Sequence, residues 1–201
     1  MNPWDLRYAE KGLAYGEEPN DFLAAVAEKL LKPGGRVLSL GEGEGRNALF
    51  LASKGFQVTA LDASWAGLSK ARARAAERGL NLETALADLS ETTLDEGAWD
   101  GILAIWCHLP APLRRRVHRQ AARALKPGGV FILETYTPGQ LKLKTGGPRE
   151  LDRLATLKDL KADLKGLEFL HALEGERLVL EGKYHHGPGA VAQVAARRPI
   201  A

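Results

Sequence analysis

A strand that runs into a glycine-rich turn and then into a helix constrains the fold of this chain more than any other feature. Residues 37–52 read VLSLGEGEGRNALFLA. The apolar run is typical of a buried strand, and the glycines Gly41, Gly43 and Gly45 allow a ligand to approach the backbone closely. A turn of this kind predicts an α/β architecture with a ligand at the carboxyl end of the first strand.

The segments around this turn alternate between strand and helix patterns. Strand patterns are short and apolar, and helix patterns begin at capping residues such as Asn20 and Ser64 and end at glycines. Alternation of this kind predicts parallel strands in a sheet that helices cover on both faces. The predicted strands are residues 36–40, 57–63, 81–86, 101–106 and 130–136. The predicted helices are residues 20–33, 46–55, 65–79 and 112–125.

The last third of the chain has a different pattern. Residues 137–150 read as a long loop and residues 156–166 as an amphipathic helix. The tail reads as two strands connected by a turn at HHGPG, residues 185–189, and such a hairpin is antiparallel. We therefore predict a Rossmann-like, doubly wound, mostly parallel seven-stranded sheet with an antiparallel C-terminal hairpin and helices on both faces.

Composition and charge exclude several classes of protein. The 201 residues suffice for one domain, and a net charge of +3 is too small to indicate a nucleic-acid partner by itself. No apolar run approaches the roughly 20 residues of a membrane span, and the charged N-terminus does not resemble a signal peptide. The single cysteine, Cys107, excludes an internal disulfide and fits a reducing compartment. We expect a cytoplasmic protein without a metal site.

The charge of the glycine turn discriminates between ligands. Glu42 and Glu44 stand where a dinucleotide would place its pyrophosphate, and unit charges about 5 Å apart repel by roughly 3 kcal/mol at an effective dielectric constant of about 20. S-adenosylmethionine carries two cationic groups and no phosphate, and Arg46 or the start of the following helix suits its carboxylate. Asp62 ends the next predicted strand, where a carboxylate accepts both ribose hydroxyls. These residues favour S-adenosylmethionine over a dinucleotide or an unliganded turn.

Five stretches of the chain together resemble one enzyme family. The motifs of class I S-adenosylmethionine-dependent methyltransferases are matched, in order, by VLSLGEGEGRNALFLA, VTALDAS, ALADLS, WDGILAIW and LKPGGVFILETY. Over nearly its whole length the chain most resembles the tellurite-resistance (TehB-like) and thiopurine methyltransferase branch. It departs from that branch at Ser39, where aspartate is usual, and at Glu42, where cysteine or a small residue is common. The resemblance implies a methyltransferase that uses S-adenosylmethionine.

The resemblance also implies which residues hold the cofactor. Asp62 holds the ribose hydroxyls, Asp88 accepts from the adenine amine, and Glu42 supplies the charge that Ser39 lacks. Glycines of the turn contact the methionine part, and apolar residues surround the adenine ring. The full set of expected cofactor contacts is Gly41, Glu42, Gly43, Gly45, Arg46, Asp62, Ala63, Asp88, Leu89 and Ile105.

The opening stretch WDLRYAEKGLAYGEEPNDFL resembles the lid that precedes the domain in the same branch. From this resemblance we predict an irregular lid from Trp4 to Tyr15 that orders over the bound cofactor, with both of these aromatic residues as cofactor contacts. We expect one methyltransferase domain over residues 1–201. Its expected parts are the lid segment 1–19, a cofactor-binding core 20–136, and a C-terminal helix and hairpin 137–201.

Residues that follow the fourth and fifth predicted strands are candidates for the methyl-acceptor side. Parallel strands end at the same rim as the glycine turn, so His108 and Tyr136 are expected to face the donor together with His185 of the hairpin. We assign these three residues to catalysis, to orient the acceptor or take its proton. Trp106 makes the pocket partly apolar, which suits a neutral small molecule such as a thiol, a chalcogen compound or a heterocycle. Helix entry, rim packing and a solvated turn are the structural alternatives for the three residues.

The strongest basic run is RRRVHR, residues 114–119. Apolar residues at helical spacing around it indicate the solvated outer face of a helix, with an RNA-facing patch as the alternative. We favour a small-molecule methyltransferase, monomeric or homodimeric, without a nucleic-acid partner. An RNA or protein methyltransferase on the same fold, and a non-catalytic S-adenosylmethionine- or nucleotide-binding protein, are the alternatives.

Overall fold

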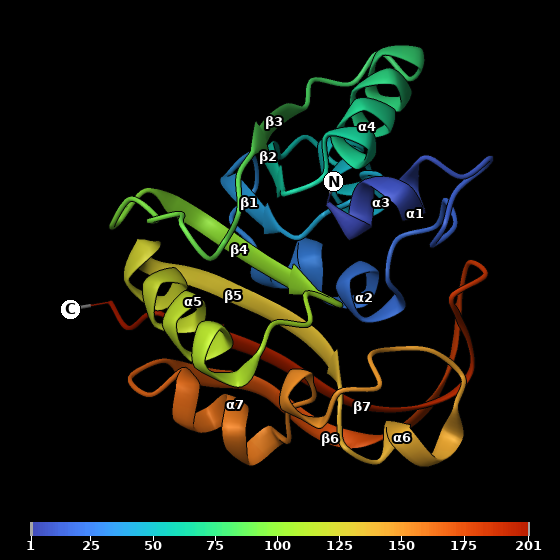
Figure 1. The fold of residues 1–201 in the computed structure, drawn as a ribbon. Helices are drawn as coiled ribbons and strands as arrows, with labels where there is room; N and C mark the ends of the chain where they lie inside the picture. Colours follow the sequence, from blue (N-terminus) through green and yellow to red (C-terminus); the bar gives the residue numbers. More distant parts are fainter. Residues whose placement is uncertain (1, 201) are drawn as a thin grey trace.

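The computed structural model describes residues 2–200 as a seven-stranded sheet with helices on both faces (Figure 1). The strands, in the spatial order β3-β2-β1-β4-β5-β7-β6, confirm the predicted doubly wound sheet with a C-terminal hairpin. The strands are β1 (Arg36–Leu40), β2 (Gln57–Asp62), β3 (Glu83–Leu86), β4 (Trp99–Ile105), β5 (Leu125–Tyr136), β6 (Glu168–Glu181) and β7 (His185–Arg197). The helices are α1 (Pro3–Tyr8), α2 (Asp21–Leu30), α3 (Arg46–Ser53), α4 (Trp65–Glu77), α5 (Ala111–Ala124), α6 (Gln140–Leu143) and α7 (Leu157–Asp163), with a 3-10 turn at Leu151–Arg153.

Strands β1 to β5 run parallel, as predicted, and the hairpin closes the sheet on one side. The pair Val37 and Val58 sets the register between β1 and β2, and the pair Leu38 and Ile102 sets it between β1 and β4. Strand β7 pairs antiparallel with both β5 and β6 and lies between them. The carboxyl ends of the parallel strands therefore meet at one edge, beside the start of β7.

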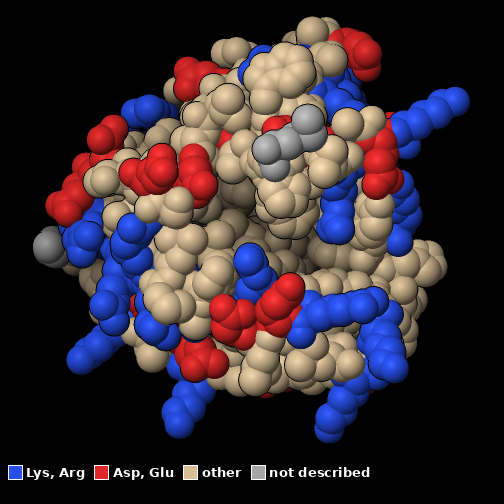
Figure 2. All heavy atoms as spheres, in the orientation of Figure 1, with Lys and Arg blue, Asp and Glu red and all other residues tan. Residues whose placement is uncertain are grey.

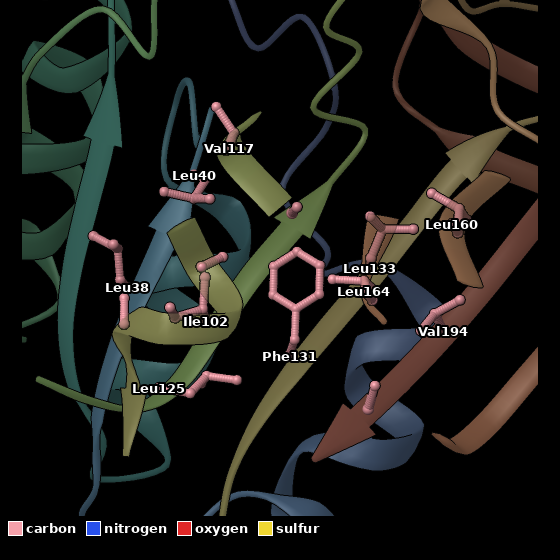
Figure 3. Packing of buried hydrophobic residues seen from close by; sticks show 14 of the residues in the cluster. Leu38, Leu40, Ile102, Val117, Leu125, Phe131, Leu133, Leu160, Leu164 and Val194 are labelled. Atoms are coloured by element: carbon pink, nitrogen blue, oxygen red, sulfur yellow. The ribbon is translucent and has the colours of Figure 1, made fainter. Parts of the chain in front are cut away.

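The core lies on both faces of the sheet. On one face Phe131 packs with Val117 of α5 and Leu160 of α7 (Figure 3). On the other face Leu23 of α2 and Leu51 of α3 pack in a second cluster of buried apolar side chains. Helices α2, α3 and α4 on one face and α5 and α7 on the other bury apolar side chains against the sheet, so the central strands are covered on both sides.

The predicted caps of two helices are confirmed. The Asn20 side chain accepts from the Leu23 amide at 3.0 Å, and the Ser64 hydroxyl accepts from the Gly67 amide at 3.1 Å. Each bond satisfies an amide that the first helical turn leaves without a partner. Among residues 2–200, no helix is long and apolar enough to cross a lipid bilayer.

The N-terminal segment is more regular than predicted. Residues expected to be irregular form helix α1, which Asn2 caps by accepting from the Trp4 amide at 3.0 Å. Pro3 stands at the first helical position, where a missing N–H costs nothing. The prediction of an irregular lid was wrong because one short helical turn with a good cap has too little periodicity to be recognised in the sequence.

The turn of the hairpin lies three residues earlier than predicted. Strand β6 ends at Glu181 and β7 begins at His185, so residues 182–184 make the turn and HHGPG belongs to β7. Gly182 supplies the positive φ, 70°, that the turn needs. Pro188 is tolerated in the strand because it lies beyond Val191, the last residue paired with β5, where hydrogen bonds are needed on one side only.

Two further predictions need correction. The loop predicted at residues 137–150 contains helix α6. In the basic run, Arg114 and His118 are buried rather than solvated, and both lie against Asp163 of α7, at 2.8 Å and 3.3 Å. The solvated outer face predicted for the run is limited to its remaining basic residues, because α7 covers part of α5.

Candidate functional site

The glycine turn connects β1 to α3 at the carboxyl edge of the sheet. Gly41, Gly43 and Gly45 all have positive φ, between 63° and 87°, which side chains rarely adopt. A Cβ at position 41 would lie 2.9 Å from the Cys107 sulfur, and one at position 43 would clash with the Tyr8 hydroxyl. The glycines thus let other parts of the chain, or a ligand, lie directly on the backbone.

Asp62, the predicted ribose contact, lies at the end of β2. Its Oδ2 accepts from the Gly43 amide at 2.8 Å, and its Oδ1 accepts from the Ser64 amide at 2.7 Å. The side chain is buried, and this burial raises the pKa of the Asp62 carboxyl. Each oxygen keeps a lone pair beyond these bonds, so the carboxylate can still accept from hydroxyl groups of a ligand.

Glu42 is occupied by the protein's own backbone. Its Oε1 accepts from the amides of Asn47 and Ala48, at 3.0 Å and 2.9 Å, and thereby caps helix α3. Its other oxygen accepts from the Ser39 hydroxyl. Burial raises the pKa of the Glu42 carboxyl. The two departures from the family motif, Ser39 and Glu42, therefore form one hydrogen-bonded unit that points toward the helix.

Arg46, the predicted partner of the cofactor carboxylate, is also engaged within the chain. It forms a buried ion pair with Glu181 of β6, and its Nη1 donates to the Glu18 carbonyl at 3.1 Å. Glu44 likewise bonds the Ala14 amide at 2.7 Å and Lys70 at 2.8 Å. Both charges of the turn thus tie it to neighbouring segments.

Four predicted cofactor contacts lie where β2, β3 and β4 end. Leu89 and Ile105 are buried and Ala63 is half-buried. Asp88 is exposed, and its Oδ1 accepts from the Ser90 amide at 2.7 Å. Figure 2 shows the surface hollowed near the ends of the central strands, beside the N-terminal segment. An apolar wall with one exposed carboxylate at its rim suits a flat ring that carries an amino group.

The N-terminal segment lies across this rim and is bonded to the start of α4. The Asn2 side chain donates to the Ala63 carbonyl at 2.7 Å. The Asp5 carboxylate accepts from the Ser64 hydroxyl at 2.6 Å and from the Ala66 amide at 3.1 Å. The segment that was predicted as a lid therefore covers the glycine turn in this structure.

The two predicted lid contacts differ in their surroundings. Trp4 is 42% exposed and stacks on Tyr8, with ring centroids 6.0 Å apart. The Tyr15 ring lies 4.8 Å from the ring of His185. Tyr15 thus faces the predicted acceptor residues, whereas Trp4 lies on the outer side of the lid.

The predicted acceptor residues are brought together in an aromatic cluster, which consists of Tyr15, Trp106, His108, Tyr136 and His185. Trp106 stacks on Tyr136 with centroids 4.4 Å apart, and His108 stacks on Tyr136 at 5.6 Å. His185 meets the Tyr136 ring edge-on at 5.2 Å. Four segments far apart in the sequence therefore supply one cluster at the carboxyl edge.

Two polar atoms of the aromatic cluster are buried without a partner. Among residues 2–200, neither the Tyr136 hydroxyl nor Nδ1 of His185 has a hydrogen-bond partner. Burial lowers the pKa of His185 to about 3 and that of His108 to about 4, and it raises the pKa of Tyr136. At neutral pH the cluster is uncharged and offers a hydroxyl donor and an imidazole to a ligand.

A buried charge network, which consists of Asn20, Arg46, Glu134, Arg177 and Glu181, lies beside the cluster. Arg177 pairs with Glu134 at 2.7 Å and with Glu181 at 2.7 Å. The Asn20 side chain donates to both carboxylates. Two arginines balance two glutamates, so the network is neutral and ties the glycine turn to the hairpin.

Trp106 connects the network to the aromatic cluster. Its indole Nε1 donates to Glu181 at 2.5 Å. Its φ is 55°, a conformation that is strained for a bulky residue and that frequently marks functional sites. The next residue, Cys107, contacts Gly41, so the cluster adjoins the glycine turn. Sequence reasoning missed this network, although the charged Glu134 within the apolar VFILETY was a signal of it.

The residues at the turn fit an adenosine-bearing cation. Gly41 and Gly43 leave the backbone uncovered by side chains of their own, and Asp62 presents a buried carboxylate. Leu89 and Ile105 provide an apolar wall. This combination matches the ribose, the ring and the positive charge of S-adenosylmethionine.

Comparison with known proteins agrees with this fit. Residues 37–129 match the family model of a methyltransferase domain. This stretch of the chain is therefore similar to methyltransferase domains. The chain is 32% identical over 126 residues to a 2-heptyl-1-hydroxyquinolin-4(1H)-one methyltransferase of Mycobacteroides abscessus. The aligned region covers 60% of this chain and 56% of the relative. It is 31% identical over 157 residues to a ubiquinone biosynthesis O-methyltransferase of Xanthomonas campestris. Here the aligned region covers 75% of this chain and 64% of the relative.

Solved structures share the fold of the methyltransferase domain and its flanking segments. A methyltransferase from Methanosarcina mazei superimposes with a TM-score of 0.71 at 20% identity and covers 88% of this chain and 98% of its own. TehB from Haemophilus influenzae superimposes with a TM-score of 0.70 at 23% identity and covers 89% of this chain and 61% of its own. The structural likenesses establish the fold. The chain spans less than two thirds of the length of the two curated relatives.

Proposed function

We propose that the protein transfers a methyl group from S-adenosylmethionine to a small-molecule acceptor. The observation that carries the proposal is the pair of buried, unpartnered atoms, the Tyr136 hydroxyl and Nδ1 of His185, beside the glycine turn. Most buried polar atoms in proteins are paired. Three other buried side-chain atoms, on Arg74, His118 and His171, also have no partner among residues 2–200, but the two in the aromatic cluster lie on residues whose rings are in contact, which favours a ligand there. An acceptor that bonds to both atoms lies within the aromatic cluster.

The chain's own residues then bind and align the acceptor. S-adenosylmethionine, when bound, supplies an activated methyl group for direct displacement, so alignment is the main requirement. Tyr136 stays protonated and donates a hydrogen bond to the acceptor. His185 is neutral at pH 7 and offers a ring nitrogen as a hydrogen-bond acceptor to a hydroxyl or thiol of the methyl acceptor. His108 lies in the same cluster. Its Nε2 accepts a hydrogen bond from the Tyr136 amide at 3.4 Å, which orients the imidazole ring.

The proposed acceptor is a neutral, planar or polarisable molecule, namely a heterocycle, a thiol or a chalcogen compound. The aromatic cluster is uncharged and offers flat surfaces for stacking. The relatives are named for a hydroxyquinolinone and for ubiquinone biosynthesis, so among these classes the hydroxylated heterocycles are the first to test.

Three further parts of the proposal follow from the sequence. We assign the chain to the TehB-like and thiopurine methyltransferase branch on its motifs, with TehB among the proteins of similar fold. We propose a single domain over residues 1–201 that acts as a monomer or homodimer in the cytoplasm. The single cysteine, Cys107, and the net charge of +3 support a reducing compartment and argue against a nucleic-acid substrate.

Two experiments test the proposal. Titration calorimetry with S-adenosylmethionine, S-adenosylhomocysteine and NAD separates a methyltransferase from a nucleotide-binding protein, and we expect binding of the first two only. A methyl-transfer screen over hydroxylated heterocycles, thiols and chalcogen oxyanions then identifies the acceptor. His108→Ala and His185→Ala should lower turnover on that acceptor while cofactor affinity stays within about a factor of three. Full activity of both variants would place the acceptor elsewhere.

A further inference from the structure

We infer that Arg7 of the N-terminal segment, rather than Arg46 or the start of α3, binds the carboxylate of S-adenosylmethionine. The inference rests on the proposed function and assigns a cofactor contact outside the matched residues 37–129. Cofactor binding and the closed position of the N-terminal segment are then one event, because the ligand itself bonds to the segment.

The start of helix α3 is the first conventional place for a carboxylate, and here it is filled. The amides of Asn47 and Ala48 donate to Glu42 at 3.0 Å and 2.9 Å. Glu42 is itself buried and bonded to Ser39. A second carboxylate at this helix end would compete for the same amides and would lie beside a like charge.

Arg46 is the second conventional place, and it is also filled. Its guanidinium pairs with Glu181, and both side chains are at least nine-tenths buried. Removing Arg46 from this pair would leave Arg177 as the one arginine that balances Glu134 and Glu181, so the buried charge network would no longer be neutral. The other cation beside the turn, Lys70, pairs with Glu44 and donates to two carbonyl oxygens.

Arg7 differs from these groups in having no acid as a partner. Among residues 2–200, no carboxylate lies within 4.0 Å of its guanidinium, which donates from Nη1 to the Tyr15 hydroxyl at 2.9 Å. The guanidinium lies over the rings of Tyr184, at 4.5 Å, and Trp4, at 5.3 Å. These contacts fix the plane of the guanidinium and leave donors free for a bidentate carboxylate.

The position of Arg7 agrees with this role. Its neighbour Tyr8 lies directly on Gly43, and its partner Tyr15 contacts His185 of the aromatic cluster. Arg7 is therefore connected to the glycine turn through its neighbour Tyr8 and to the aromatic cluster through its hydrogen bond to Tyr15. The methionine part of the cofactor is expected in this region, because the sulfonium must face the acceptor.

The test compares two ligands that differ only in the carboxylate. Titration calorimetry is performed with S-adenosylmethionine and with decarboxylated S-adenosylmethionine on the full chain. For Arg7→Ala we expect the affinity for S-adenosylmethionine to fall roughly 10- to 100-fold, as for loss of charged hydrogen bonds, and the affinity for the decarboxylated ligand to stay within about twofold. Arg7→Lys keeps the positive charge and should lose less affinity for S-adenosylmethionine than Arg7→Ala. Arg115→Ala, which removes an exposed arginine of α5, is the matched control and should change neither affinity.

The outcomes separate this inference from the proposed function. If the unaltered protein binds neither ligand, the proposed function fails and the inference with it. If it binds S-adenosylmethionine but Arg7→Ala and Arg7→Lys bind as tightly, or lose affinity equally for both ligands, the assignment of Arg7 is overturned while the proposed function stands. Thermal unfolding of each variant shows whether it is folded.

Discussion

Asp62 accepts hydrogen bonds from Gly43 and Ser64, so one carboxylate holds the glycine turn against the start of α4. Glu42 is also buried, but its carboxylate accepts from two amides of α3 and from the Ser39 hydroxyl. Two acids from neighbouring motifs thus have different bonding partners. The difference comes from geometry rather than charge, since burial raises the pKa of both carboxyl groups.

Replacement of Asp62 tests its assignment to the ribose. Asp62→Ala should weaken S-adenosylmethionine binding by roughly 2 kcal/mol, because two hydroxyls lose a charged acceptor. Titration calorimetry measures the affinity, and thermal unfolding monitors the structural bonds to Gly43 and Ser64. Asp88→Ala is the comparison for the adenine end. Unchanged affinity of a folded Asp62→Ala protein would contradict the ribose assignment.

The buried histidine His185 predicts how stability depends on pH. Its pKa is lowered from about 6.5 to about 3, so between these values the unfolded chain binds a proton that the folded protein does not. The stabilisation is therefore complete above pH 6.5 and is lost as the pH falls. Relative to His185→Gln, the unaltered protein should lose about 2 kcal/mol of unfolding free energy between pH 7 and pH 5, measured by urea denaturation. A pH-independent difference would show that His185 titrates normally.

At the scale of elements, the buried charge network joins β5, β6 and the starts of α2 and α3. Glu134 on β5 is fully buried, with an exposed fraction of 0%, and bonds to Arg177 through both oxygens. Such a network contributes little net stability when intact but costs much when one partner is removed. The main effect of the network is to fix the position of the hairpin relative to the glycine turn.

Glu134→Ala should therefore destabilise the protein by about 2–3 kcal/mol, because the half-buried Arg177 keeps Glu181 but loses both charge-assisted bonds to Glu134. The matched control is Glu168→Ala, which breaks the exposed pair of Glu168 and Arg197 on the same hairpin. That change should cost less than about 1 kcal/mol. Urea denaturation gives both values, and equal effects would mean that the network is as weak as a surface ion pair.

The N-terminal segment is expected to respond to the ligand. Amide exchange over Trp4 to Tyr15 should slow roughly tenfold or more when S-adenosylhomocysteine is added, because the ligand bridges the segment and the glycine turn. Helix α7, which carries none of the predicted cofactor or acceptor contacts, serves as an internal reference. Equal exchange in both states would contradict a role of the segment as a lid.

The sequence predicted elements well where local and long-range signals agree. Asn20 and Ser64 cap helices as predicted, because a cap is defined by residues within one turn. The hairpin turn was misplaced because Gly182 and the pair Gly187 and Pro188 are equally good turn formers, and only pairing with β5 and β6 decides between them. The acceptor residues were predicted from strand ends, and most cofactor contacts were predicted from the family resemblance. The network around Glu134 depends on contacts between distant segments and has no local pattern.

At the scale of the whole molecule, the charge network and the shared core make the parts interdependent. Near-ultraviolet and far-ultraviolet circular dichroism should therefore report one unfolding transition, with midpoints that agree within about 2 °C. Limited proteolysis before the transition should leave the segment around residue 137 uncut. Separate transitions would mean that the core and the C-terminal hairpin are independent units rather than one domain.

The contact between the N-terminal segment and the hairpin turn has a consequence for how the protein is made. Glu10 pairs with Lys183 across 173 residues of sequence, and the Lys183 amide donates to the Ala14 carbonyl at 3.2 Å. During translation the glycine turn and the first strands leave the ribosome long before this hairpin exists. The bonds of the N-terminal segment to the start of α4 can form at that stage, whereas those to the hairpin turn cannot. Strands β6 and β7 therefore complete the attachment of residues 10–14 after the rest of the sheet has been made.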